Sequence, residues 1–379
     1  MLQNLVLIGG GHSHAIVLQL WGSNPLPGVR LTLISDTSYA PYSGMLPGYV
    51  AGIYTFEECH IDLPRLAKFA GVELVLDRAV GLDLKQNQVL CANHPPIAFD
   101  FLSIDIGSTP QASNIPGATQ YTIPAKPVPQ FLQHWHQLLE TAQETPEKPL
   151  SLGIIGGGAG GVELALTMQS RLHQIISPQN LTLHLFHRGS ELMEGHSAAV
   201  RKRLQRILVK RGVQIHLKEA VKAVYPGEDE GVRVECESGL EVECDRSFWV
   251  TQAAASPWIA ESGLSTDSRG FIVVEDTLQS MSHPQIFAAG DIATMVNHPR
   301  PKAGVFAVRQ GKPLWQNLQA AVLGKPLKPY IPQKQLLGLI GTGDGKAIAS
   351  RGSWGFGPTA WLWCWKDRIA RAFMERFKY

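Results

Sequence analysis

The stretch Leu5-Val6-Leu7-Ile8-Gly9-Gly10-Gly11-His12-Ser13-His14 decides the fold. Four apolar residues lead into three glycines, and the residues from Ala15 to Leu20 can continue as a helix. A strand, a glycine turn and a helix in this order point free backbone N–H groups and the positive helix end at one place. The stretch therefore predicts a turn that binds a dinucleotide pyrophosphate, although His14 replaces the third glycine of the usual G-x-G-x-x-G pattern.

A second strand is predicted from Val29 to Ser35, after a proline- and glycine-rich turn. It completes a strand–helix–strand unit. In such units an acidic side chain about 20 residues past the glycines binds the ribose hydroxyls. Ser35 occupies that register and Asp36 follows it, so both are candidates, with the hydroxyl the weaker ligand.

The same pattern returns in complete form later in the chain. The apolar run Leu150–Ile155 is followed by Gly156-Gly157-Gly158-Ala159-Gly160-Gly161 and a predicted helix. Two such turns predict two dinucleotide sites. The next strand ends in His187 and Arg188, where a carboxylate would favour an unphosphorylated ribose. Arg188 suits a 2′-phosphate but also an ordinary solvated surface position, so NADH and NADPH both stay open.

Three further segments are placed to complete the first site. A strand from Asp100 closes on Gly107-Ser108-Thr109-Pro110, and the strand Ile286–Ala289 ends in Gly290-Asp291. A carboxylate at a strand terminus would lie at the ligand crevice of a parallel sheet and accept hydrogen bonds from hydroxyl groups. On this segment alone, an ordinary turn aspartate is the favoured alternative. The helix predicted from Lys302 follows, so N–H groups near Gly304 and Val305 would stabilise negative charge on a bound cofactor.

The stretch Tyr39–Gly48 is rigid, uncharged and punctuated by glycines, with two aromatic residues. It suits packing against a flat ring, which makes Pro41 and Gly44 candidate contacts. An ordinary surface loop is an equal alternative.

Composition excludes several classes of protein. The 379 residues are 44% hydrophobic and 17% charged, which predicts two or three well-packed domains. A formal net charge of +2 gives nucleic-acid binding no support. The five cysteines lack zinc-like spacing, so we expect reduced thiols in a cytoplasmic protein and no metal site. The N-terminal residues lack the basic region of a signal peptide, and the sequence has no run of about 20 apolar residues, so we expect neither a signal peptide nor a membrane span.

The last helix, within the segment Gln335–Tyr379, is amphipathic. Its apolar face is predicted to hold Trp361, Trp365, Ile369, Ala372 and Phe373, and its polar face Asp367, Arg371, Glu375 and Lys378. Tryptophans beside basic residues suit a helix at a membrane interface. Docking on the protein itself or on a second subunit, in a homodimer, is at least as compatible with the pattern, so peripheral attachment to the cytoplasmic face of a membrane stays open.

The two glycine turns, the Gly107–Pro110 strand end and the segment ending in Asp291 resemble the pyridine nucleotide-disulfide oxidoreductase superfamily over roughly residues 1 to 323. The resemblance implies an α/β fold with two Rossmann-like domains. Residues 1–115 and 249–323 would form an FAD domain, interrupted by an NAD(P)H domain at 116–248 and followed by a small α+β domain at 324–379.

The resemblance also implies roles for single residues. Glu163 would lie beside the nicotinamide, Val80 would contact the adenine through its backbone, and Asp291 would bind the ribityl and phosphate end of FAD. The other candidates for FAD are Gly9, Gly11, His12, Ser13, Ser35, Asp36, Pro41, Gly44, Gly107, Gly290, Gly304 and Val305. The candidates for NAD(P)H are Gly156, Gly158, Gly161, His187 and Arg188.

One departure from the family is informative. Tyr42-Ser43-Gly44-Met45 stands where the disulfide members carry their redox-active cysteine pair, so dithiol and sulfide:quinone chemistry are not expected. The remaining pattern looks like type II NADH dehydrogenases. Across nearly the whole chain, the motifs Gly9–His14, Tyr39–Gly48, Ala303–Gly311 and Trp365–Phe377 also resemble the flavoprotein module fused ahead of selenide, water dikinase.

These features predict an FAD-dependent NAD(P)H oxidoreductase. Hydride would pass from nicotinamide C4 to flavin N5 without a protein general base, and electrons would then pass to a second acceptor, most economically a quinone. The alternative is a redox-sensing or electron-supplying module for a selenium-handling partner such as selenide, water dikinase.

Overall fold

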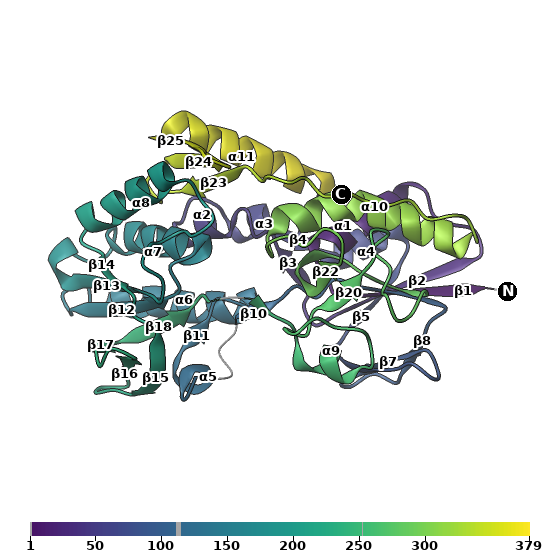
Figure 1. The fold of residues 1–379 in the computed structure, drawn as a ribbon, viewed down its shortest axis with the longest axis horizontal. Coiled ribbons are helices and arrows are strands. Elements are labelled where there is room, and N and C mark those ends of the chain that lie inside the picture. Colours follow the sequence, from purple (N-terminus) through teal and green to yellow (C-terminus); the bar gives the residue numbers. More distant parts are fainter. Residues whose placement is uncertain (1, 111–114, 252) are drawn as a thin grey trace.

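The computed structural model describes residues 2–110, 115–251 and 253–379. Two α/β halves lie side by side, and the C-terminal helix α11 lies across them (Figure 1). The predicted proline-rich crossing after Pro110 begins in residues 111–114, which lie outside the described residues.

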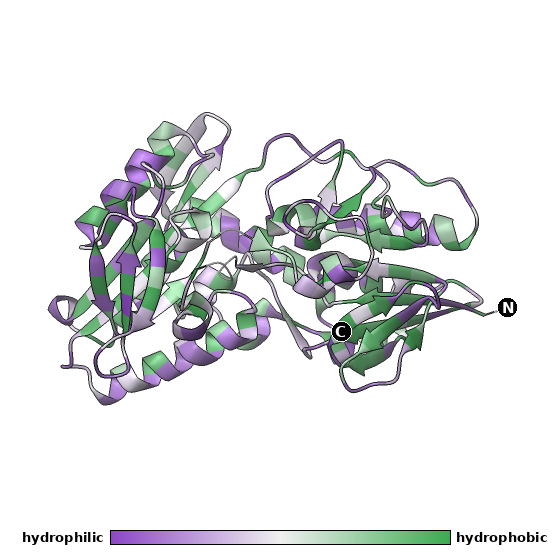
Figure 2. Ribbon diagram, turned by 60° about the horizontal axis from the view of Figure 1, so that its bottom comes forward, coloured by the Kyte–Doolittle hydropathy of each residue, from purple (hydrophilic) through white to green (hydrophobic). Residues whose placement is uncertain are grey.

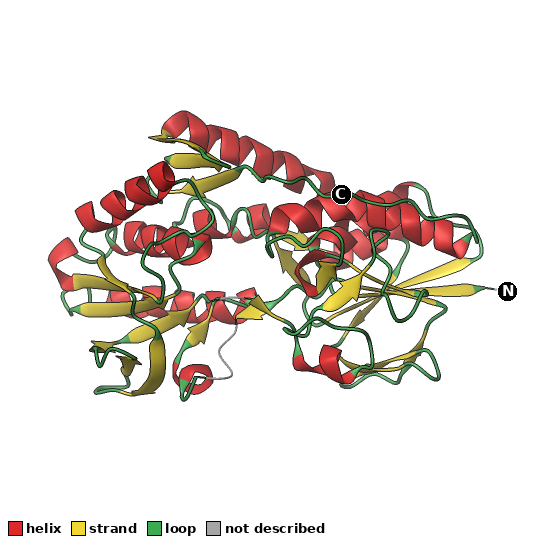
Figure 3. Ribbon diagram, in the orientation of Figure 1, coloured by secondary structure: helices red, strands yellow, loops and turns green. Residues whose placement is uncertain are grey.

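The first half is built on a five-stranded parallel sheet in the order β21-β9-β1-β2-β5. Helices α1, α4 and α10 lie on one side of this sheet, and β6–β8 with α9 lie on the other (Figures 1 and 3). The strands are β1 (Gln3–Ile8), β2 (Val29–Ser35), β5 (Glu73–Leu76), β9 (Phe101–Ile104) and β21 (Ile286–Ala288), and the helices are α1 (His12–Ser23), α4 (Leu63–Ala70), α9 (Pro257–Glu261) and α10 (Gly304–Val322).

The second half repeats this plan with the parallel order β11-β18-β12-β13-β14. The two parallel sheets and their crossover helices confirm the predicted α/β class. The elements are β11 (Ile123–Pro124), β12 (Leu150–Ile155), β13 (Leu181–His187), β14 (Gln214–Leu217), β18 (Arg246–Trp249), α6 (Val128–Glu144), α7 (Ala159–Leu172) and α8 (Ala198–Lys210).

Smaller elements join and cover these sheets. One antiparallel pair, β10 with β19, carries the chain between the halves. Strand β18 ends at Trp249, and β19 begins at Ala253. The others are β3 (Tyr39–Pro41), α2 (Leu46–Val50), α3 (Phe56–Cys59), β4 (His60–Asp62), β6 (Ala79–Asp83), β7 (Gln88–Cys91), β8 (Ile97–Ala98), β10 (Thr109–Pro110), α5 (Ala118–Tyr121), η1 (Pro178–Asn180), β15 (Val221–Pro226), β16 (Val232–Cys236), β17 (Glu241–Cys244), β19 (Ala253–Ala254), β20 (Ile272–Val274), η2 (Gly290–Ile292) and β22 (Ala293–Met295).

The C-terminal unit is a three-stranded antiparallel sheet followed by α11. Strand β25 escaped prediction because Gly352, Gly355 and Gly357 hide its alternation. The elements are β23 (Gly338–Gly341), β24 (Ala347–Arg351), β25 (Trp354–Thr359), α11 (Ala360–Met374) and η3 (Glu375–Phe377).

The core follows from the hydrophobic runs. Strand β1 is covered on both faces, so Leu5 to Ile8 are at most 2% exposed, as parallel strands with helices around them require. Figure 2 shows hydrophobic strands inside and helices with alternating hydrophilic and hydrophobic bands outside. Cys236 and Cys244 are buried in the β16–β17 hairpin, and all five cysteines are free thiols.

His14 explains the missing third glycine of the first turn. Its ring is fully buried, with Nδ1 2.7 Å from the Gly9 carbonyl and Nε2 2.8 Å from Ser103 Oγ. Because the carbonyl only accepts, Nδ1 donates and Nε2 accepts in a neutral ring. Burial lowers the pKa of His14 to about 4. The neutral imidazole therefore links the Gly9 carbonyl of the glycine turn to Ser103 of β9.

The predicted apolar face of α11 is exposed over most of its width and buried at one edge. Trp361, Trp365 and Ile369 are 55%, 42% and 46% exposed, whereas Phe373 is buried. At about 100° per residue, Phe373 lies roughly 120° around the helix from Trp361, at the edge of this face, where it stacks on Tyr42. The face is therefore partly docked on the protein itself.

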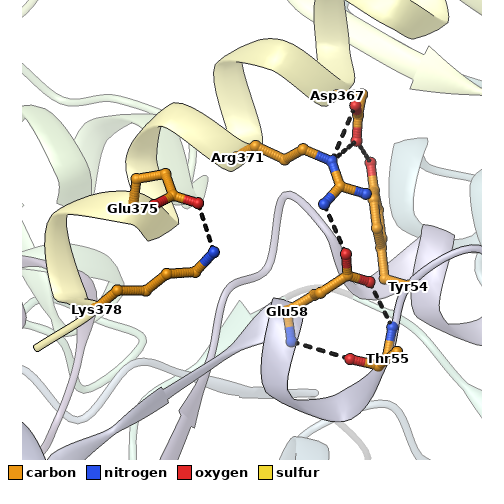
Figure 4. A network of polar contacts seen from close by, with 7 residues as sticks. All are labelled: Tyr54, Thr55, Glu58, Asp367, Arg371, Glu375 and Lys378. Atoms are coloured by element: carbon orange, nitrogen blue, oxygen red, sulfur yellow. Dashed lines mark hydrogen bonds and ion pairs between the residues drawn. The ribbon is translucent and has the colours of Figure 1, made fainter.

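The polar face of α11 docks on the first half of the molecule (Figure 4). Arg371 donates to Glu58 of α3 at 2.6 Å and to Asp367 at 2.9 Å, and the Tyr54 hydroxyl donates to Asp367 at 2.7 Å. Burial and the Asp367 carboxylate together raise the pKa of Tyr54, so its hydroxyl stays protonated and donating. These charge-assisted bonds fix the helix on the N-terminal half.

We expect Arg371→Met to loosen α11. Loss of its bonds to Glu58 and Asp367 removes about 1 kcal/mol at this partly exposed network, so amide hydrogen exchange in α11 should accelerate roughly fivefold. Lys378→Met is the matched control, because the ion pair of Lys378 is with Glu375 of its own C-terminal segment. Equal exchange in the two variants would show that the network does not hold the helix.

The buried His14 predicts an acid-sensitive fold. A neutral histidine whose pKa falls from 6.5 to about 4 on folding stabilises the protein above pH 6.5, and this stability is lost as pH falls toward 4. The loss amounts to about 3 kcal/mol in the free energy of unfolding. Urea titrations at pH values from 7 to 4 should show that the free energy of unfolding falls less in His14→Asn than in the wild type, by about this amount. His134→Asn, at an exposed position of α6, should follow the wild type.

Candidate functional site

The first glycine turn is shaped by the end of β9. Gly9 has φ +93°, and a Cβ there would lie 2.4 Å from the Asp105 carbonyl oxygen. Gly11 is the N-cap of α1, and a Cβ there would lie 2.3 Å from the Asp105 carboxyl carbon. Both positions therefore require glycine. The turn thereby places the N-terminus of α1 at the carboxyl edge of the sheet, as a pyrophosphate site requires.

The Gly290-Asp291 turn meets the first turn from β21. Asp291 Oδ2 accepts hydrogen bonds from Ser108 Oγ and Lys126 Nζ, each at 2.9 Å. Burial opposes ionisation of Asp291, but Lys126 and the Ser108 hydroxyl hold its pKa below the usual value. The predicted residues Gly107, Gly290 and Asp291 thus lie together with the first turn, with Asp291 ionised at neutral pH.

The loop Tyr39–Gly48 closes over this site from the other side. The Tyr42 ring stacks on Phe373 of α11 with centroids 4.4 Å apart, and the His12 ring meets Tyr42 edge-on at 5.3 Å. A Cβ on Gly304 would lie 2.4 Å from Ser43 Oγ, so the loop contacts the start of α10. Pro41 ends β3 and Gly44 packs beside the Tyr42 ring, while Val305 follows Gly304 in the first turn of α10.

The His12 ring is neutral at this position. Its Nε2 lies 3.4 Å from the Ser43 backbone N–H, which can only donate. Burial lowers the pKa of His12 to about 4, against the attraction of Asp291. The ring therefore adds no positive charge beside the predicted FAD turn.

The predicted ribose and adenine contacts lie along the edge of the same sheet. Ser35 is buried and its hydroxyl donates to the Thr37 carbonyl at 2.8 Å, whereas Asp36 is exposed at the end of β2. Of the two candidates, Asp36 is the one with a carboxylate free to accept. Val80 is 40% exposed on β6.

The second glycine turn has the same tight construction. A Cβ on Gly161 would lie 1.8 Å from the Gly156 carbonyl oxygen, so α7 approaches the turn backbone closely. Gly158 is the N-cap of α7. His187 Nδ1 lies 3.3 Å from the Gly157 N–H, and its buried Nε2 has no hydrogen-bond partner. Arg188 is exposed beside it.

Glu163 lies one helical turn into α7 and faces the C-terminal unit. Its Oε1 accepts from the Gly341 N–H at 2.7 Å and forms an ion pair with Lys366 of α11. The two side chains are 14% and 11% exposed. Removing one partner of a nearly buried ion pair is costly, because the other charge is left buried without a partner.

Four polar residues of these sites carried no sequence signal. They are Lys126 in the loop before α6, Asp105 at the end of β9, Lys302 just before α10, and Lys366 in α11. Lys302 donates to the Ala293 carbonyl at 2.7 Å, and burial lowers its pKa to about 8. Each residue reaches its partner only through the tertiary fold.

Known proteins share this architecture. The family model described as pyridine nucleotide-disulphide oxidoreductase matches residues 3–311. The NADH dehydrogenase-like protein YutJ of Bacillus subtilis is 24% identical over 347 residues, 91% of each chain. Demethylphylloquinone reductase NdbB of Synechocystis is 27% identical over 271 residues, 70% of this chain and 65% of its own.

Among solved structures, the sulfide:quinone oxidoreductase of Aquifex aeolicus superposes with a TM-score of 0.80 at 20% identity, covering 99% of this chain and 91% of its own. At that identity the likeness shows the fold alone. The family model, by contrast, spans most of the sequence and both glycine turns. The chain therefore belongs to the pyridine nucleotide-disulphide oxidoreductase family.

Proposed function

We propose that this protein is an FAD-dependent NAD(P)H:quinone oxidoreductase. The observation that carries the proposal is the pair of glycine turns, each at the carboxyl end of a parallel sheet, with Glu163 between the second turn and α11. When FAD and the nicotinamide are bound, hydride passes from C4 to N5 and electrons pass on to the acceptor. Family membership supports both cofactors, FAD and NADH or NADPH.

The residues present fit FAD. Cβ atoms at Gly9, Gly11 and Gly290 would each clash with Asp105, so glycine lets the two turns pack together on the end of β9, at the N-terminus of α1 where an anion would bind. Asp291 is an ionised carboxylate that would accept hydrogen bonds from the ribityl chain. At the second turn, Gly158 is the N-cap of α7, whose first backbone N–H groups would bind the pyrophosphate of the nicotinamide nucleotide.

Glu163 and Lys366 would orient the nicotinamide. Gly341 N–H and Lys366 fix the Glu163 carboxylate at the start of α7. A carboxylate held in this way accepts a hydrogen bond from the carboxamide and limits rotation of the ring. The role is positioning, because hydride transfer needs no proton from the protein.

A quinone is the acceptor that suits the outer face of α11. Trp354, Phe356, Trp361, Trp365 and Ile369 are all 42–55% exposed, and we call them the aromatic patch. The neighbouring side of α11 carries Lys366 and Phe373, which reach Glu163 and Tyr42. The helical residues of the aromatic patch therefore lie on the same helix as the residues that contact Glu163, beside the second glycine turn, and the Tyr39–Gly48 stretch.

The patch would rest on a membrane surface. No helix in the described part of the chain is long and apolar enough to span a bilayer. Exposed tryptophans beside basic residues of α11 bind the interface between headgroups and acyl chains. The name of the Synechocystis protein states a quinone substrate, which supports the same class of acceptor here.

The finer predictions stay proposals. We keep the FAD domain at 1–115 and 249–323, the NAD(P)H domain at 116–248 and the C-terminal domain at 324–379 as proposals, although strand β18 (Arg246–Trp249) of the second sheet crosses the limit between residues 248 and 249. The selenium-handling partner, the homodimer and the choice between NADH and NADPH likewise stay predictions.

Stopped-flow mixing of the flavin-loaded protein with NADH or NADPH, without oxygen, tests the function. We expect rapid bleaching with one nucleotide and reoxidation by a soluble quinone. Glu163→Gln should slow bleaching roughly 10- to 100-fold through poorer orientation, whereas Glu140→Gln, on the exposed side of α6, should not. The double variant Glu163→Gln with Lys366→Met guards against an unpaired buried lysine. Slow bleaching in the wild type, or a reduced flavin that no quinone reoxidises, would contradict the proposal.

Liposome flotation tests the membrane contact. The wild type should float with vesicles, and replacing Trp361 and Trp365 by serine should cut recovery at least tenfold, because two interfacial aromatic side chains are lost. Ile331→Ser is the matched control, since Ile331 is 69% exposed outside the patch. Equal flotation of all three proteins would assign the aromatic patch a different role.

A further inference from the structure

Asp105 lies where the two turns of the proposed FAD site meet. Its Oδ2 accepts from the backbone N–H groups of Ser13 at 2.8 Å and His14 at 3.2 Å, at the N-terminus of α1. The residue is 2% exposed. Cβ atoms on Gly11 and Gly290 would each lie 2.3 Å from its carboxyl group. A buried carboxyl group is thus sandwiched between the two glycines that the cofactor turns require.

The charged groups around Asp105 leave it without a cation of its own. Asp291 of η2 adds a second negative charge. The cation of the loop before α6, Lys126, is ion-paired with Asp291, and Lys302, at the approach to α10, donates to Ala293 and Thr294. From α1, the rings of His12 and His14 are held neutral by burial. Among the described residues, no basic side chain is ion-paired with Asp105.

Burial therefore dominates at this carboxyl group. It raises the pKa of Asp105 to about 7, against the two backbone N–H groups that favour the anion. A dinucleotide pyrophosphate brings two more negative charges to the same helix end. Three anionic groups would then lie close together. Protonating Asp105 relieves the repulsion at the smallest cost, because Asp105 is buried without a basic partner whereas Asp291 is paired with Lys126.

We propose that Asp105 is a positioning residue that couples FAD binding to the uptake of one proton. The inference rests on the proposed FAD site. The Asp105 carboxylate takes a proton from solvent as FAD binds, and no other bond forms or breaks. Oδ2 keeps its two N–H bonds, so the proton resides on Oδ1, which faces Gly290. The neutral carboxyl group keeps the two turns in place without repelling the pyrophosphate.

FAD binding to the apoprotein, followed by flavin fluorescence from pH 6 to 9, tests the inference. The wild-type Kd should rise up to tenfold per pH unit above about pH 7. Asp105→Asn, a neutral side chain of the same shape, should give a constant Kd and bind at least tenfold more tightly than the wild type at pH 8.5. Asp100→Asn is the matched control, since Asp100 is exposed at the opposite end of β9, and it should keep the wild-type slope.

Calorimetry needs no variant. Phosphate and Tris differ in their enthalpy of ionisation. The FAD-binding enthalpies of the wild type measured in these two buffers at pH 7.5 should therefore differ by an amount that corresponds to the uptake of most of one proton per FAD. If no proton is taken up, the inference is overturned but the proposed FAD site is not. The same holds if the Kd of Asp105→Asn keeps the wild-type dependence on pH, as titration of Lys302 would produce. A wild type that binds no FAD at any pH overturns the proposed function instead.

Discussion

The first half of the structure depends on how the end of β9 packs against two turns, the glycine turn at residues 9–11 and the Gly290-Asp291 turn. The Asp105 carbonyl presses against Gly9, and its carboxyl group presses against Gly11 and Gly290. Any side chain at these three positions would push strand and turn apart. The turns therefore meet at the carboxyl edge of the parallel sheet, where open α/β sheets bind their ligands.

The same region is unusual in its polar groups. It holds two buried carboxyl groups of different character: Asp291, paired with Lys126 and ionised, and Asp105, without a basic partner and poised near neutrality. The neighbouring histidines are neutral and serve as hydrogen-bonding braces. Environment, rather than residue type, separates these roles, because burial and partners shift each group differently.

Helix α11 connects the two halves. One side reaches Glu163 of the second half through Lys366, and the same helix reaches Glu58 and Tyr42 of the first half through Arg371 and Phe373. Its outer side leaves tryptophans exposed. A helix with both properties ties the relative placement of the two dinucleotide turns to the surface that would meet a quinone.

The sequence by itself determined the two glycine turns, the strands and helices around them, and hence the α/β fold and the family. These features are local: a strand, a turn that needs positive φ or close backbone approach, and a helix start within about fifteen residues. Tertiary structure alone decided which polar groups meet there. Lys126 finds Asp291, Lys366 finds Glu163, and Asp105 lies between Gly11 and Gly290, over separations of roughly 90 to 200 residues. No periodicity in the chain records such pairs, and the buried side of Phe373 was likewise fixed by packing against Tyr42, because a helical pattern gives a face but not its neighbour.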